Sequence, residues 1–250
     1  MSYRDYLHCE KCDCKMNNLF LRTCNADGTS HGGFRWNLEI GGITEAPDWN
    51  PEPECGGGLH GLLNGKGEGG HLNHSKDALW MVCEALGPIV DIDHKIKTSK
   101  AKTLFVGDRK GATDFLIASG CNPSEVVGAF ITGGDDSTVT GGDRSTVTGG
   151  KWSTVTGGIS STVTGGDYST VTGGQDSTVT GGYRSTVTGG EFSTVTGGYW
   201  STVTGGNGSV LSLKWFDGRR DRIITAYVGE DGIEPNVPYK LDENGKFVRA

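Results

Sequence analysis

The sequence predicts a β protein: a parallel two-sheet β-solenoid with 16 residues per coil, preceded by an N-terminal α+β domain and followed by a C-terminal β-rich cap. Three observations predict this class. From Gly133 to Gly206 the chain is nine consecutive octapeptides, each Gly-Gly-x-x-Ser-Thr-Val-Thr, closed by a further Gly-Gly. Residues 18–120 have an ordinary mixed composition, and residues 213–250 alternate short strand patterns with turns. A short fixed period is the signature of a solenoid.

Each repeat predicts one short strand and one turn. Ser-Thr-Val-Thr is rich in β-branched residues and alternates polar and apolar side chains, which favours a strand. Gly-Gly is expected to supply positive φ angles that separate successive strands. Because side chains alternate with period two, Ser and Val should face inward and the two Thr outward. Eight residues cannot enclose a core, so two octapeptides should face each other in each coil, with alternate repeats stacked about 4.8 Å apart.

This register places the threonines in two exposed, uncharged arrays. All nine x-x pairs differ, whereas the other six positions never change. The invariant Thr can be explained by β-propensity and cross-strand contacts, or by a binding function of the exposed face. Neighbouring hydroxyls would lie about 4.8 Å apart between coils and about 6.7 Å apart along a strand. The larger array, of five strands, is the candidate binding face: Thr138, Thr140, Thr154, Thr156, Thr170, Thr172, Thr186, Thr188, Thr202 and Thr204.

The x positions of the odd repeats form two columns along one edge of the solenoid. Aromatic side chains gather there, and Arg184 is expected to stack between Tyr168 and Trp200. Exposed aromatic clusters mark protein interfaces, so a protein partner or self-association along this edge is expected. The alternative is that unselected turn residues merely stack. The candidate interface residues are Trp152, Tyr168, Tyr183, Arg184, Tyr199 and Trp200.

Composition narrows the function classes. A net charge of −7 argues against a nucleic-acid partner or a membrane surface. No apolar run reaches membrane length, and the N-terminal residues do not resemble a signal peptide, so a cytoplasmic protein, host or phage-encoded, is expected. Four segments follow: a Cys-rich segment (1–17), the α+β head domain (18–124), the octapeptide solenoid (125–212) and the β-rich cap (213–250).

The N-terminal segment contains a possible zinc site. Seven unevenly spaced cysteines favour reduced thiols or a metal site over a disulfide framework. Cys9, Cys12 and Cys14 include one Cys-x-x-Cys, which suits half of a tetrahedral zinc site, and Cys24 or His31 could supply a further ligand. No second Cys-x-x-Cys is present, so a reduced surface loop is the alternative.

The head domain should contain several strands and one helix. Asp108 is a predicted helix N-cap, and the helix should run to about Ser119 before Gly120 and Pro123. Residues Leu79–Leu86 fit a strand or a helix. The other expected elements are strands at Leu19–Cys24, Phe34–Ile40 and Thr103–Gly107 and a long loop at Ala46–Gly70.

A glycine-rich run in that loop, Gly56–Gly61, suggests a head-domain site. His60 near Cys55 could bind an anion or a nucleotide, which leaves an enzyme or nucleotide-binding activity as an alternative function. No paired carboxylate, P-loop or nucleophile motif accompanies them. A polar or packing role is the competing interpretation of His60, and also of His71 and His74.

Two sets of segments carry a resemblance, an N-terminal set at Leu21–Cys24, Glu54–Gly61, Glu84–Gly87 and Ile89–Asp91 and a C-terminal set at Val237–Leu241 and Gly245–Val248. The N-terminal set resembles an uncharacterised domain at the head of phage and bacterial proteins that carry tandem octapeptides, and the C-terminal set resembles the tail of the same proteins. The resemblance covers most of the chain and brings no established activity, but it implies that Trp80–Leu86 is a strand. The repeats also resemble the Thr-x-Thr octads of bacterial ice-nucleation proteins, although this chain repeats one octad instead of two alternating ones and has far fewer copies.

Solenoid ends expose unpaired backbone and need covering. At the first end, Ala129–Thr132 aligns with Ser-Thr-Val-Thr, and Phe130 should pack under the head domain. At the other end, Ser209–Ser212 aligns in the same way with Leu211 at the Val position. The cap should add strands near Ser212–Phe216, Arg222–Val228 and Tyr239–Leu241 and a hairpin turn at Glu243–Gly245.

The preferred function is a non-enzymatic solenoid that binds a partner or assembles through its Thr faces and aromatic edge. Ice binding, in which a flat Thr array orders water, is the first alternative. A head-domain activity is the second.

Overall fold

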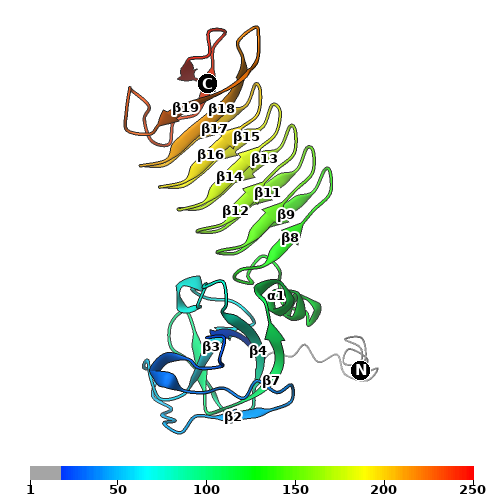
Figure 1. Ribbon diagram of the computed structural model, residues 1–250, viewed down its shortest axis with the longest axis vertical. Coiled ribbons are helices and arrows are strands. Elements are labelled where there is room, and N and C mark those ends of the chain that lie inside the picture. Colours follow the sequence, from blue (N-terminus) through cyan, green and yellow to red (C-terminus); the bar gives the residue numbers. More distant parts are fainter. Residues whose placement is uncertain (1–17) are drawn as a thin grey trace.

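The computed structural model describes residues 18–250 as a head domain, a stack of parallel coils and a terminal cap (Figure 1). Parallel strands with a 16-residue register confirm the predicted two-sheet β-solenoid. No helix within residues 18–250 is long and apolar enough to cross a membrane.

The head is built on one seven-stranded sheet. Strand β1 lies at its centre and pairs antiparallel with both β3 and β4. The strands run in the order β2 (Ile43–Glu45), β7 (Lys100–Gly107), β4 (Leu79–Ala85), β1 (Leu19–Cys24), β3 (Leu59–Leu63), β6 (Ile96–Thr98), β5 (Ile89–Asp91). Short 3-10 turns occur at His31–Gly33 and Gly69–His71.

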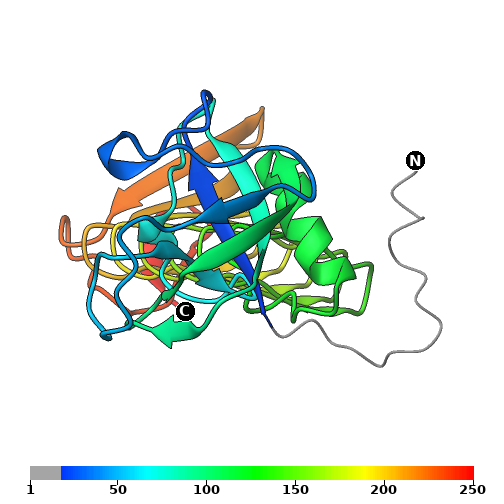
Figure 2. The ribbon, with the colours of Figure 1, turned by 90° about the horizontal axis from the view of Figure 1, so that it is seen from below.

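The residues of β1 face two cores in alternation. Leu19 and Leu21 pack with helix α1 (Arg109–Ala118) on one face of the sheet, and Phe20 and Cys24 pack with Trp36 on the other. Figure 2 shows α1 at one side of the head sheet. The predicted cap of α1 is confirmed, because the Asp108 carboxylate accepts a hydrogen bond from the Gly111 N–H at 2.7 Å.

Two expectations for the head were wrong, and one open alternative is decided by the structure. Phe34–Ile40 is not a strand but a covering segment that places Trp36 over the sheet. The segment Ala46–Gly70, expected to be a loop, contains strand β3. The glycines in and before this strand concealed its strand pattern in the sequence. Gly61 is required there because a Cβ would lie 2.3 Å from the Phe20 ring. Leu79–Leu86, ambiguous in the sequence, forms strand β4 through Ala85.

The repeats form two sheets, each of which takes every second octapeptide. One contains β9 (Thr138–Thr140), β11 (Thr154–Thr156), β13 (Thr170–Thr172), β15 (Thr186–Thr188) and β17 (Thr202–Thr204). The other contains β8 (Phe130–Thr132), β10 (Thr146–Thr148), β12 (Thr162–Thr164), β14 (Thr178–Gly181), β16 (Thr194–Gly197) and β18 (Val210–Phe216).

The inward face is the predicted ladder of Val and Ser. Eight of the nine repeat valines have no exposed surface, and the repeat serines from Ser145 onward are at most 2% exposed. From Ser161 onward, each hydroxyl donates to a Gly carbonyl of the preceding coil at 2.9–3.2 Å, as Ser169 does to Gly150. The hydroxyl also accepts the N–H of the Ser one coil earlier. The buried hydroxyls are therefore satisfied by the stacking itself.

The expected role of the repeat glycines was wrong. None of the repeat glycines has a positive φ angle. The residue with left-handed backbone is instead the second x of each repeat, as at Trp152 (φ 56°) and Trp200 (φ 60°). The glycines are required for close approach. A Cβ on Gly149 would lie 2.4 Å from a methyl group of Val155, and one on Gly166 would lie 2.7 Å from the carbonyl carbon of Gly150 in the preceding coil. The first Gly of the pair therefore leaves room for the core, and the second for the preceding coil.

The head and the first coil are joined through packed side chains and backbone hydrogen bonds. Ile131 on β8 aligns with Val147 and contacts both the solenoid core and the α1 core. The expected packing of Phe130 under the head takes the form of a cation–π contact, with the Arg109 guanidinium 4.3 Å from the ring centroid. The Val127 N–H also donates to the Gly65 carbonyl at 2.9 Å.

The last coil is covered by the predicted β-rich cap. Strand β19 (Asp221–Tyr227) pairs antiparallel with β18, and β20 (Tyr239–Leu241) joins β17. The predicted hairpin leads from β20 to β21 (Phe247–Arg249). Tyr239 is 3% exposed and its ring lies in the solenoid core, so it closes the end of the Val ladder.

Candidate functional site

The structure brings the ten candidate Thr side chains of the binding face onto one outward sheet surface, on β9, β11, β13, β15 and β17. Adjacent strands are in register, so that Thr154 lies beside Thr138 and Thr170. In most of these strands the first Thr is exposed and the second half-buried. The face therefore presents one open and one recessed row of hydroxyl and methyl groups, and no charged side chain interrupts either row.

The opposite sheet has a shorter free Thr surface. Arg109 of α1 donates to the Thr146 hydroxyl at 3.4 Å and to the Arg144 carbonyl at 3.3 Å, so the head covers part of β10. Beyond β16 the sheet continues into Val210 and Ser212 in place of Thr. The five-strand sheet is thus the larger uniform Thr array.

The structure also brings side chains of the predicted aromatic edge into contact. The Trp152 and Tyr168 rings stack at 5.9 Å between centroids, and Tyr183 meets Tyr168 edge-on at 5.5 Å. Trp200 is 78% exposed, further along the same edge. The Tyr199 hydroxyl donates to the Asp221 carboxylate of the cap.

One detail of that edge was wrong. Arg184 does not stack between Tyr168 and Trp200; its guanidinium lies 5.3 Å from the centroid of the neighbouring Tyr183 ring.

Within residues 18–250 no group of three or more His, Cys, Asp or Glu side chains could hold a metal ion. Of the four proposed zinc ligands, Cys9, Cys12 and Cys14 lie outside the described residues. Cys24 lies in the buried core behind β1, where its thiol contacts the Met81 sulfur at 3.6 Å and burial raises its pKa. Burial in a sheet core is unsuited to a shared ligand set, so nothing in the described residues supports zinc at Cys24.

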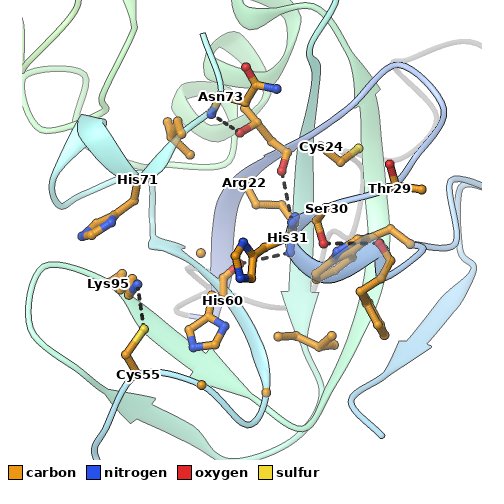
Figure 3. Close-up of a pocket in the computed structure, with 18 of the residues that line it drawn as sticks. Arg22, Cys24, Thr29, Ser30, His31, Cys55, His60, His71, Asn73 and Lys95 are labelled. Carbon is orange, nitrogen blue, oxygen red and sulfur yellow. Dashed lines mark hydrogen bonds between the residues drawn. The ribbon is translucent and has the colours of Figure 1, made fainter. Parts of the chain in front are cut away.

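The head contains a cavity of about 870 Å³ at the face of the sheet covered by Trp36 (Figure 3). The two candidate head residues, Cys55 and His60, both line it, together with His31 and His71. Cys55 is exposed, and its sulfur accepts a hydrogen bond from the Lys95 ammonium at 3.4 Å.

The loop that carries Cys55 is held by a buried lysine. Lys97 on β6 has no exposed surface, and its ammonium donates to the carbonyls of Glu54 and Gly56 at 2.8 and 3.0 Å. These bonds compensate for the burial of the ammonium and orient the glycine run toward the cavity.

Arg22 is the residue of this cavity that the sequence reasoning missed. Its side chain is 9% exposed and stacks on Trp36, with the guanidinium carbon 3.6 Å from the ring centroid. Burial lowers the pKa of Arg22 to about 10. The available signal was an arginine directly after the apolar run Leu19–Leu21 in an expected strand.

His60 lies among cations. Burial lowers the pKa of His60, and the nearby charges of Lys95, Lys97 and Arg22 lower it further, while Asp48 opposes them. The cavity is thus electropositive around the His60 imidazole.

The repeats are similar to those of ice nucleation proteins. Over 104 residues, 40% of this chain, the identity to the ice nucleation protein of Xanthomonas campestris pv. translucens is 39%. It is 37% over 117 residues for the protein of Pseudomonas syringae pv. syringae and 35% over 102 residues for InaU of Pantoea ananas. The matched region spans only 6–10% of the length of these relatives. No family model and no solved structure matches the chain.

Proposed function

We propose that the solenoid binds ice through the five-strand Thr face. The observation that carries the proposal is the in-register array on β9, β11, β13, β15 and β17, which is uncharged and not covered by the head. The β-solenoid fold, and the sequence similarity of the repeats to those of ice nucleation proteins, fit a repeat scaffold or an ice-nucleation-like role.

The physical basis is the repetition of one side chain on a rigid sheet. Each Thr offers a hydroxyl that donates and accepts hydrogen bonds, next to a methyl group that cannot. Hydroxyls repeated about every 4.8 Å across strands give adjacent water molecules equivalent partners, so that water can be held in an ordered layer. Five strands extend the array over about 19 Å. An array of this size is expected to bind existing ice rather than to nucleate freezing efficiently.

The test uses two substitutions that differ only in the face they occupy. Thr170→Lys and Thr178→Lys change the first Thr of strands β13 and β14, both exposed and both central in their sheets. We expect the parent protein to partition into a growing ice front and to show thermal hysteresis. Thr170→Lys should lose most of this effect and Thr178→Lys should retain it.

The proposal fails if the parent protein shows neither ice partitioning nor thermal hysteresis. It also fails for this face if the two Lys variants behave alike. Circular dichroism and thermal unfolding of both variants provide the folding control.

A second candidate function is self-association along the aromatic edge. The stacked pair Trp152–Tyr168 supports it, because both side chains remain more than two-fifths exposed although they are large and apolar. A second copy of the chain can bury the same columns against each other in a symmetric dimer. This arrangement would leave the Thr face free.

Sedimentation velocity of the parent and of the Trp152→Ala/Trp200→Ala double variant tests this candidate. We expect a dimer that dissociates in the double variant. Phe192→Ala, which removes a 60% exposed ring from the opposite edge, is the matched control and should not change the sedimentation coefficient. A monomeric parent would contradict the candidate.

A further inference from the structure

The head cavity contains buried polar groups that have no partner. Within residues 18–250, four buried side-chain nitrogen or oxygen atoms lack a hydrogen bond, and three of them belong to residues that line this cavity. They are Arg22 Nε, Trp36 Nε1 and His60 Nε2. Buried polar atoms are nearly always paired, so a cluster of three at one cavity indicates an absent partner.

The central member of the cluster is a charge without a counterion. The Arg22 guanidinium has five N–H donors. It uses two, toward the carbonyls of His60 (3.4 Å) and Thr23 (3.1 Å), and no carboxylate in the described part of the chain forms an ion pair with it. A buried cation that is not neutralised destabilises the folded state. Its position in the central strand is therefore more readily explained by a bound anion than by stability.

The surroundings of Arg22 favour an anion as well. Lys95 lines the same cavity with a half-buried ammonium, whereas Asp48 is the one acidic side chain in the lining. Gly56, Gly57 and Gly58 also line it, and their N–H groups donate to no acceptor in residues 18–250. The side chain of Trp36 adds a further unpaired N–H. These donors reach the cavity from β1, from the segment before β3 and from the residue before β6.

We propose that this cavity binds a small molecule that carries a phosphate group, with Arg22 and Lys95 contacting the phosphate. Donors that converge from several directions suit the tetrahedral oxygens of a phosphate better than the two coplanar oxygens of a carboxylate. The volume of about 870 Å³ falls within the usual range of small-molecule sites. Phe34, Leu59 and Leu72 supply apolar lining for an organic part of the ligand. This site is independent of the Thr face and of any role in ice binding.

Isothermal titration calorimetry on the full chain, in a chloride buffer, tests the site. The probes are inorganic phosphate, pyrophosphate and AMP, with adenosine and citrate as the comparisons that lack phosphate. We expect saturable binding of at least one phosphate probe and none of adenosine or citrate. Binding of inorganic phosphate alone would identify the free ion as the ligand, and tighter binding of AMP would identify a phosphorylated organic molecule. The proposal is overturned if no phosphate probe binds at millimolar concentration, or if citrate binds as tightly.

Three variants assign the binding to the named residues. Arg22→Met keeps the packing on Trp36 and removes the buried charge, so it should unfold at the same temperature as the parent or higher while phosphate binding weakens at least tenfold. Lys95→Gln should weaken binding at least threefold. Lys76→Gln is the matched control, since Lys76 is an exposed head lysine outside the cavity lining.

Unchanged affinity in Arg22→Met would overturn the assignment. If that variant does not fold, the comparison of Lys95→Gln with Lys76→Gln decides, because equal affinities of these two would contradict a role for the cavity.

Discussion

The Asp167 carboxylate accepts a hydrogen bond from the backbone N–H of Tyr183, one coil further along, at 2.9 Å. Asp135 bonds the Lys151 N–H, and Asp143 the Ile159 N–H, in the same way. Aspartate at the first x position therefore satisfies a turn N–H that the neighbouring coil would otherwise leave to solvent. The variable turns thus contribute to the solenoid wherever they carry this residue.

Asp167→Ala should consequently destabilise the solenoid by about 0.5–1.5 kcal/mol, the usual net value of one such hydrogen bond. Asp167→Asn retains the acceptor and should recover most of the loss. Both variants remove the ion pair with Lys151, which is solvent-exposed and contributes little. Urea unfolding followed by circular dichroism measures the difference. Equal stability of the Ala and Asn variants would show that the hydrogen bond does not matter.

The second Gly of the repeat offers a sharper contrast. A Cβ on Gly166 would lie 2.7 Å from the Gly150 carbonyl carbon, whereas one on Gly134, at the first coil, would contact nothing within 4 Å. Gly166→Ala should lower the free energy of unfolding by about 1–3 kcal/mol, since the coils must separate to admit the methyl group. Gly134→Ala should be neutral or raise it by up to about 1 kcal/mol. Thermal unfolding of the pair measures both; similar losses would argue against close approach as the cause.

The left-handed backbone at the second x position predicts an order of stability among substitutions of Trp200. Trp200 has φ of 60° and is 78% exposed, so it bears the steric cost of this conformation with little packing in return. Asparagine tolerates left-handed backbone better than other non-glycine residues. Trp200→Asn should therefore be more stable than Trp200→Ala by up to about 1 kcal/mol, a part of the roughly 1–2 kcal/mol cost of the conformation. Trp200→Val should be the least stable of the three in urea unfolding.

Two histidines predict a loss of stability in mild acid. Burial lowers the pKa of His60 and of His74 in the folded head, whereas in the unfolded chain both titrate near pH 6.5. As pH falls below about 6.5, the unfolded state takes up protons that the folded state does not, so stability present at pH 7.5 is lost progressively. The melting temperature of the head should therefore fall between pH 7.5 and pH 5.

His60→Gln/His74→Gln should reduce that fall, because neither glutamine titrates. An anion in the head cavity would raise the pKa of His60, so the measurement is made in phosphate-free buffer. An unchanged slope in the double variant would contradict the assignment.

Comparison of particular elements shows which parts of the fold were predictable. Strand β1 and the Asp108 cap were predicted at their observed positions, because a short, mostly apolar run at Leu19–Cys24 and an N-cap residue directly before a helical segment are local signals. Strand β3 was assigned to a loop, since its glycine at position 61 is explained only by the Phe20 ring of the neighbouring strand. Trp36 was expected in a strand, because its actual position depends on contact with a sheet that distant segments of the chain form.

The candidate sites also include some residues that the sequence predicts and others that only the structure identifies. The Thr array and the aromatic columns could be derived from the repeat, although Arg184 contacts a different tyrosine from the one expected. Cys55 and His60 were singled out by a glycine-rich run, but the cation that defines their cavity, Arg22, lies 33 residues before Cys55 in the chain. No local pattern connects them.

The sequence by itself determined the 16-residue coil, the inward Val and Ser and the outward Thr, because a period-two alternation within an eight-residue repeat admits one consistent register. Only the tertiary structure decided why each glycine is required, which Thr face remains free, and that an unpaired arginine lies in the head cavity. Those features depend on distances between segments that are remote in the chain. Such distances are set by the packing of whole coils and sheets and leave no mark in a short stretch of residues.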